Sequence, residues 1–191
     1  MAAAGIAPDG RTFAGVLQTC RHARDWRRAI YVFFDMEAKH PEFADAHTWN
    51  RLLQVLYVHP APDSTLAAAA LMAQRGVVPI TATYNTVLWA HAMRGDSAAI
   101  KKVLTSMRAA GEEVTLTTLA MCAKGYGYGR HWGAAEDALE AVLNSDSTIT
   151  MRVQTATAFV HACSRAGDLP RIVRWLQRLP LLGLTPLPRM W

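Results

Sequence analysis

The sequence has no long apolar run and few cysteines, and these two absences exclude broad classes of protein. Its longest apolar candidate, LAAAALMA at 66–73, is much shorter than the roughly 20 residues of a membrane-spanning helix. The three cysteines show no paired spacing, so a disulfide framework is not expected and a reducing compartment is favoured. The opening residues, MAAAGIAPDG, contain no basic residue and no apolar h-region, so they resemble neither a signal peptide nor a transit peptide.

Motifs for metal binding and catalysis are also missing. The seven histidines and three cysteines show neither C-x-x-C nor H-x-x-x-H spacing, so no metal site is predicted. No acidic cluster is present that could hold a catalytic Mg²⁺ ion. The glycine-rich KGYGYGR at 124–130 lacks a preceding strand and the GK[ST] of a phosphate loop, so it is predicted to form the bend between two helices. The sequence therefore predicts a protein that is not an enzyme and has no cofactor.

What the chain does have is a composition typical of a folded, basic protein. Hydrophobic residues make up 51% of the 191 residues and charged residues 18%, which separates the chain from disordered sequences. Twenty lysines and arginines against 15 aspartates and glutamates give a net charge of +5. This excess is compatible with a polyanionic partner, but basic proteins without such a partner also show it.

A short pattern recurs about every 35 residues along the chain. TATYNTVL at 81–88 aligns with AHTWNRLL at 46–53 and with LTTLAMCA at 116–123. Allowing one or two inserted residues adds GRTFAGVL at 10–17 and VQTATAFV at 153–160. The third position of every copy is a threonine: Thr12, Thr48, Thr83, Thr118 and Thr155. Several copies in one register indicate a repeat protein.

Each copy is predicted to form two amphipathic helices. In the copy that begins at Thr81, the residues Tyr84, Val87 and Leu88 lie on one helix face, and the second half of the copy repeats this spacing. Aspartates are predicted to cap the second helices at Asp96 and Asp168. The glycines predicted to close second helices in the left-handed conformation are Gly76, Gly111 and Gly183.

No segment of the chain is predicted to form a strand. A single helix pair cannot bury both of its apolar stripes, but a stack of neighbouring pairs can. The predicted fold is therefore all-α, an α-solenoid of stacked helix–turn–helix repeats.

The unit TYNTVL…RGD…M…G-x-x-P within 81–115 resembles the pentatricopeptide repeat. GIAPD at 5–9 and ARDWRRAI at 23–30 also resemble the pattern of this family, and the tetratricopeptide repeat fits less well. The resemblance gives the tail of a preceding repeat at 1–9, repeats at 10–45, 46–80, 81–115, 116–152 and 153–187, and the start of another at 188–191. An array cut in mid-repeat exposes apolar faces, so the chain is expected to be a piece of a longer protein or to dock end to end against partners.

The resemblance implies binding of single-stranded RNA, one base per repeat, through one residue of the first helix and the last residue of the repeat. The base-facing positions would be Ala14, Asn50, Asn85, Ala120 and Thr157, with the companions Asp45, Ile80, Thr115, Arg152 and Leu187. Among these, Asn50, Asn85, Thr157, Asp45 and Thr115 are the predicted base contacts. The chain departs from the family because two of the positions are alanine and both asparagines have non-standard companions, so no target sequence is predicted.

The phosphate contacts that the resemblance implies are His22, Arg94, Lys124 and Arg165, near the ends of first helices. Solvated turns would explain these side chains equally well. The densest positive patch of the sequence is formed by Arg21, Arg24, Arg27 and Arg28, and a solvated helix face is an equal alternative there.

The predicted function is that of a non-catalytic pentatricopeptide-repeat RNA-binding protein of a mitochondrion, or alternatively of a plastid. It would act in RNA processing, stability or translation inside a large ribonucleoprotein such as the mitochondrial ribosome. Its partners would be single-stranded or structured RNA, including ribosomal RNA, and neighbouring proteins; no membrane span and no small-molecule ligand are expected. The alternative from another class is a protein–protein scaffold that makes no direct RNA contact.

Overall fold

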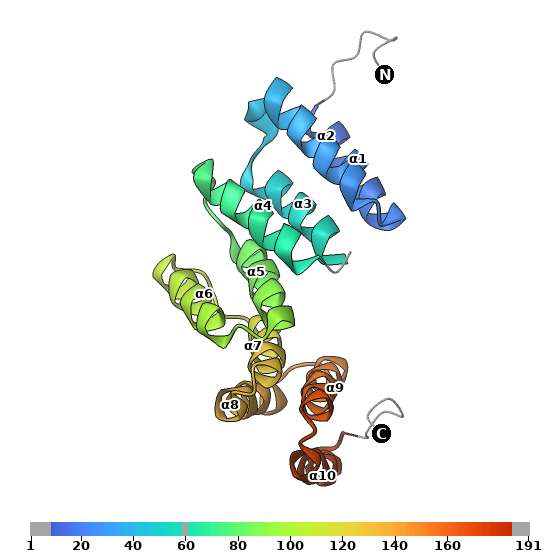
Figure 1. Ribbon diagram of the computed structural model, residues 1–191, viewed down its shortest axis with the longest axis vertical. Helices are drawn as coiled ribbons and strands as arrows, with labels where there is room; N and C mark the ends of the chain where they lie inside the picture. Colours follow the sequence, from blue (N-terminus) through green and yellow to red (C-terminus); the bar gives the residue numbers. More distant parts are fainter. Residues whose placement is uncertain (1–8, 59–60, 185–191) are drawn as a thin grey trace. The chain divides into compact units, whose positions relative to one another are not determined.

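The computed structural model describes residues 9–58 and 61–184, and ten α-helices follow one another along them (Figure 1). Their bounds are α1 (Gly10–Ala23), α2 (Trp26–Lys39), α3 (Ala46–Val58), α4 (Pro62–Gln74), α5 (Thr81–Arg94), α6 (Ser97–Ala109), α7 (Leu116–Tyr128), α8 (Trp132–Leu143), α9 (Ile149–Ala166) and α10 (Leu169–Arg178). Two short 3₁₀ helices are η2 (Pro41–Phe43) and η3 (Pro180–Leu182). No strand occurs in the described ranges, so the all-α prediction is confirmed.

The helices pack in chain order, as the predicted solenoid requires. The chain divides into a first unit, Met1–Ala90, and a second unit, His91–Trp191. In the first unit α1 packs against α2 and α3, and α3 packs against α4. In the second unit α7 packs against α8 and α9, and α9 packs against α10. Within the described residues, every helix is too short or too polar to cross a membrane.

The first unit is held by a core of large side chains. Trp49 on α3 is fully buried, and its ring centroid lies 4.4 Å from that of Phe33 on α2 in an edge-to-face arrangement. Leu17 of α1 and Leu52 of α3 are buried in the same cluster. Because both rings are completely removed from water, this contact is a main source of stability for the unit.

In the second unit, three glycines lie where helices approach each other closely. A Cβ atom added at Gly125 of α7 would lie 2.9 Å from the Cα atom of Ala92 on α5. One added at Gly127 would lie 2.9 Å from the Cβ atom of Ala162 on α9. At Gly129 the added atom would lie 2.6 Å from the carbonyl oxygen of Gly95. Side chains at these three positions would therefore push the backbones apart.

These contacts correct the expectation for the glycine-rich segment. It was predicted to form a bend, but residues up to Tyr128 belong to α7 and the turn begins only at Gly129. Helix packing explains the difference, because the loss of helix propensity at a glycine is offset where two backbones must approach each other.

The predicted helix caps are present. Asp96 and Asp168 each accept a hydrogen bond from a backbone N–H in the first turn of the following helix. Gly76, Gly111 and Gly183 adopt the left-handed conformation, with φ of +72°, +75° and +71°. Asp168 caps α10, and Gly183 follows η3 rather than α10 itself.

The helix α9 begins earlier than the repeat pattern indicates. Its N-cap is Thr148, whose side chain accepts a hydrogen bond from the backbone N–H of Met151, so the helix gains about one turn before residue 153. Arg152, a predicted repeat end, therefore lies inside α9. The partial repeats predicted at 1–9 and 188–191, and the companion Leu187, lie outside the described residues apart from Asp9.

Candidate nucleic-acid interface

The predicted base contact Asn50 is buried inside the first unit. Its side chain is 5% exposed, and its Oδ1 atom accepts a hydrogen bond of 3.1 Å from the hydroxyl of Thr83 on α5. Its Nδ2 atom is buried without a hydrogen-bond partner. The expectation that Asn50 projects onto an open face is thereby corrected, because the amide serves the contact between α3 and α5. A base contact by this residue stays a prediction.

The other predicted base contacts also have structural roles or are partly covered. Asn85 of α5 and Thr157 of α9 are half-buried, and the Thr157 hydroxyl donates a hydrogen bond of 2.7 Å to the carbonyl oxygen of Val153. Asp45 accepts a hydrogen bond of 2.8 Å from the backbone N–H of Thr48, at the start of α3.

Thr115 serves the start of α7 in the same way that Asp45 serves the start of α3. It forms a capping box with Thr118, in which each side chain accepts a hydrogen bond from the backbone N–H of the other. Asp45 and Thr115 therefore stabilise helix starts, whether or not they also contact RNA.

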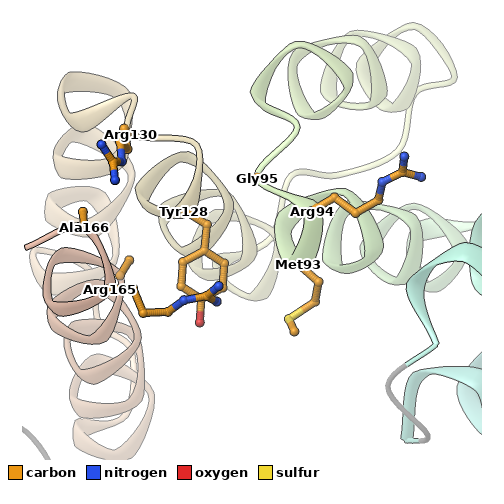
Figure 2. A pocket seen from close by; sticks show the side chains of 8 residues that line it. Met93, Arg94, Gly95, Tyr128, Arg130, Arg165 and Ala166 are labelled. Carbon is orange, nitrogen blue, oxygen red and sulfur yellow. The ribbon is translucent and has the colours of Figure 1, made fainter.

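Three of the four predicted phosphate contacts lie at the C-terminal ends of first helices in the second unit. Arg94 ends α5, Lys124 lies in the last turns of α7, and Arg165 lies in the last turn of α9. Arg94 and Arg165 line one pocket of about 200 Å³, together with Tyr128 and Arg130 (Figure 2). The fourth prediction, His22, belongs to the first unit, where its exposed ring lies 3.0 Å from the side-chain nitrogen of Gln18.

Tyr128 organises the positive charge around this pocket. The Arg165 guanidinium reaches the Tyr128 ring in Figure 2. It lies 4.9 Å from the ring centroid, and the Lys124 ammonium lies 5.8 Å from the same point. The phenol oxygen of Tyr128 lies 3.4 Å from Nδ1 of His161. Cation–π contacts of this kind hold long basic side chains in place without neutralising their charge.

Burial lowers the pKa of Lys124 from its ordinary value. A lysine that is held in a desolvated position gains from an anion nearby, because the anion favours its charged form. The pocket is therefore lined by three arginines, one of which lies over the Tyr128 ring, and a partly desolvated lysine lies beside the same ring. Such an arrangement can bind an anion of the size of a phosphate group.

Two further features of the described residues concern metal binding and the buried thiols. No group of three or more histidines, cysteines or acidic residues is placed to hold a metal ion in the described part of the chain. Burial raises the pKa of the Cys122 thiol to about 12 and that of Cys163 to about 11, so neither is an activated nucleophile.

The comparisons with known proteins find solved structures of similar fold but no family model and no curated sequence that matches the chain. The pentatricopeptide repeat protein PPR10 from maize, in complex with an 18-nt psaJ RNA element, superposes with a TM-score of 0.67 over 96% of this chain at 23% identity. The chain has the pentatricopeptide-repeat fold. PPR10 without RNA superposes over 100% of this chain with a TM-score of 0.57 and the same identity.

A second pentatricopeptide-repeat structure of different activity is also similar. The nuclear proteinaceous RNase P 2 (PRORP2) from A. thaliana superposes with a TM-score of 0.62 over 91% of this chain at 16% identity. The chain spans 27% of the PPR10 chain and 38% of the PRORP2 chain. The likeness thus concerns a short stretch of repeats.

The repeat pattern of the sequence did not indicate that Tyr128 and Arg130 line the pocket. A signal for Tyr128 was present, because Lys124 and Tyr128 are four residues apart and therefore share a helix face. Arg130 carries no such signal, because it lies in the turn after α7 and lines the pocket only where α7 packs against α9.

Proposed function

We propose that the chain is a non-catalytic RNA-binding protein of the pentatricopeptide class that acts in an organelle, in RNA processing, stability or translation. The observation that carries this proposal is the pocket around Tyr128, which is lined by Arg94, Arg130 and Arg165 near the ends of α5, α7 and α9. A positively charged rim of this kind attracts the phosphates of a polynucleotide. The superposition on a PPR10 chain that holds an RNA element supports the same function.

The bound RNA is held mainly through its backbone. The pocket of about 200 Å³ is large enough for a phosphate group, while the Tyr128 ring is already in contact with cations. Two base-facing positions are the alanines Ala14 and Ala120, which have no side-chain hydrogen bond to offer, and the Asn50 side chain is buried. Phosphate contacts position a protein on a nucleic acid but carry no sequence information.

Weak base reading fits a protein that is positioned by neighbours within a large assembly. We therefore place the chain in a ribonucleoprotein such as the mitochondrial ribosome, with a plastid assembly as the alternative. The test is ultraviolet crosslinking in the organelle, followed by sequencing of the attached RNA. Reads that concentrate at one ribosomal RNA locus support the assembly, whereas reads scattered over messenger RNAs contradict it.

RNA binding by the pocket can be tested on the full chain with a labelled oligouridine. Arg130→Gln combined with Arg165→Gln should weaken binding and reduce the slope of log K against log salt by about 1, because two phosphate contacts are lost. The matched control is Lys102→Gln combined with Arg108→Gln, which removes the same charge from exposed positions on α6. Equal slopes for the two variants would exclude the pocket from RNA binding.

A protein–protein scaffold is the second candidate, favoured by exposed apolar side chains at the end of the second unit. Leu169 and Val173 on α10 are 68% and 52% exposed, and Leu181 in η3 is 84% exposed. Single exposed apolar residues are common, but Leu169 and Val173 are four residues apart on one helix face. A partner bound there would be insensitive to salt, and Val173→Asp would weaken its binding while leaving RNA affinity unchanged.

A further inference from the structure

The turn between α1 and α2 carries a dense group of positive charges. Arg21, Arg24, Arg27 and Arg28 fall within eight residues, with His22 between them. The side chains of Arg24, Arg27 and Arg28 are exposed and that of Arg21 is half-buried. We call these four arginines the turn patch.

The turn patch has almost no negative charge to balance it. Asp25 is the one acidic residue between Gly10 and Phe34. Its Oδ1 atom accepts a hydrogen bond of 3.0 Å from the backbone N–H of Arg28, so the carboxylate caps α2. Within the described residues, none of the four guanidinium groups forms an ion pair. Arg27 lies 5.1 Å from the Trp26 ring, a contact that leaves its charge intact.

The backbone of the turn is fixed rather than loose. Arg24 adopts the left-handed conformation with φ of +55°, and its N–H group donates a hydrogen bond of 3.2 Å to the carbonyl oxygen of Arg21. The N–H group of Asp25 donates one of 3.0 Å to the carbonyl oxygen of Cys20. These bonds end α1, and Asp25 is the N-cap at which α2 begins. The arginines are therefore presented from a defined scaffold.

Arginines that serve packing look different in this protein. On α10, Arg171 and Arg174 both bind the carboxylate of Glu136, and Arg178 lies 2.6 Å from a carboxylate oxygen of Glu140. Where these arginines join two helices, each is therefore paired with a glutamate. In the turn patch the chain keeps like charges together at a cost in electrostatic repulsion, which a polyanion bound there would offset.

Two of the base-facing positions of the first unit, on α1 and α3, offer no polar group that is open to solvent. Ala14 has none, and the amide of Asn50 is buried against Thr83. Arginine matches phosphate oxygens with its planar fork of donors and cannot lose its charge near neutral pH. From these observations we infer that the turn patch binds the sugar–phosphate backbone of RNA without reading its bases, an inference that rests on the proposed RNA-binding function.

The experiment compares single-stranded and duplex RNA, because a duplex hides its bases but displays its backbone. The full chain is titrated with a labelled oligouridine and with a labelled RNA duplex between about 50 and about 200 mM salt. The variant is Arg24→Gln, Arg27→Gln and Arg28→Gln together. The matched control removes the same charge from exposed positions on α6 with Lys101→Gln, Lys102→Gln and Arg108→Gln.

The variant should lose affinity for both RNAs, and the slope of log K against log salt should fall by about 2 for the single strand and by about 3 for the duplex. The control should keep the slope of the original chain. A variant slope equal to that of the control would overturn the inference, and so would a loss confined to the single strand. If the original chain binds neither RNA, the proposed function fails and the inference fails with it.

Folding is checked separately by circular dichroism. The variant should unfold at the same temperature as the original chain or higher, because repulsion between the arginines is removed. If it does not fold, the charge-retaining variant Arg24→Lys, Arg27→Lys and Arg28→Lys replaces it. That variant should keep the slope of the original chain for both RNAs, because lysine retains the positive charge. A fall of the slope by the amount expected for three lost contacts would contradict binding of the RNA backbone through charge.

Discussion

Both units contain a buried pair of aromatic rings, Phe33–Trp49 in the first and Phe159–Trp175 in the second, but only the second adds close contacts at glycines of α7. In the first unit, Trp49 and Phe33 fill the space between α2 and α3 with two fully buried rings. In the second unit, Gly125 and Gly127 have no side chain, so α7 can come close to α5 on one side and to α9 on the other. A core of large side chains is destabilised when side-chain volume is removed, because a cavity is left. A close contact at a glycine is destabilised when side-chain volume is added.

The units also differ in their use of arginine. The arginines of α10 are bound by glutamates of α8, whereas those of the α1–α2 turn are left without acidic partners. The first unit also has an arginine that joins helices, since Arg75 after α4 pairs with Glu37 of α2, so the contrast lies between the arginines of α10 and those of the α1–α2 turn. Measurements of stability test how the packing and the ion pairs of the two units differ.

Loss of volume should damage the first unit most. Trp49→Ala is expected to lower the free energy of unfolding by about 3–5 kcal/mol, because it removes a fully buried ring and leaves a cavity. Denaturant unfolding combined with amide hydrogen exchange would show the loss and place it in the first unit. The control Tyr31→Ala, at a side chain that is 71% exposed, should change the free energy by less than about 0.5 kcal/mol.

Added volume should damage the second unit. Gly125→Ala is expected to lower the free energy of unfolding by about 1–3 kcal/mol, since the new methyl group meets the backbone of Ala92. The same change at Gly15 of α1, where nothing lies within 4 Å, should raise it by about 0.5–1 kcal/mol through helix propensity. If both substitutions stabilised the protein, the account of close backbone packing in α7 would be wrong.

The ion pairs of the second unit can be tested at Glu136. One oxygen of this carboxylate accepts hydrogen bonds from Arg171, Arg174 and the indole nitrogen of Trp175. Glu136→Gln should cost about 1–2 kcal/mol, because the bonds are charge-assisted and partly shielded from water. Glu140→Gln breaks the single, exposed pair with Arg178 and should cost less than about 1 kcal/mol. Equal costs would mean that α10 does not depend on this cluster.

Alkaline pH should weaken the second unit through its buried thiols. Above about pH 8.5 an unfolded cysteine loses its proton, whereas Cys122, with a pKa of about 12, keeps it in the folded state. The folded state then binds more protons than the unfolded state, so stability falls as pH rises and the fall continues up to the folded pKa. Between about pH 8 and about pH 9.5 this thiol should account for a loss of about 1 kcal/mol, which Cys122→Ala should abolish.

Much of the fold could be predicted from the sequence, because the features that specify it are local and repeated. The period of the threonines, the apolar spacing around Tyr84 and the caps at Asp96 and Asp168 depend on residues a few positions apart. The start of α9 could not be predicted, because the repeat pattern begins only at residue 153. In the folded chain Thr148 is the N-cap, and the helix begins directly after it.

The candidate site was less predictable. Arg94, Lys124 and Arg165 were predicted as phosphate contacts from their places in the repeat, but the pocket forms only because the ends of α5, α7 and α9 come together around Tyr128. Asn50 shows the reverse case. Its repeat position indicates an exposed amide, yet its contact with Thr83, which is 33 residues away in the sequence, makes it part of the interior.

Periodicity, short-range hydrogen bonds and composition were enough to predict the helices, their order and the excess of positive charge. The packed chain was needed to see which polar groups are buried, which arginines meet a carboxylate and why Gly125, Gly127 and Gly129 lie at close contacts. The two kinds of feature differ in the separation of the residues along the chain. Those contacts join residues some 30 or more positions apart, and burial and ion pairing depend on neighbours that a local pattern does not specify.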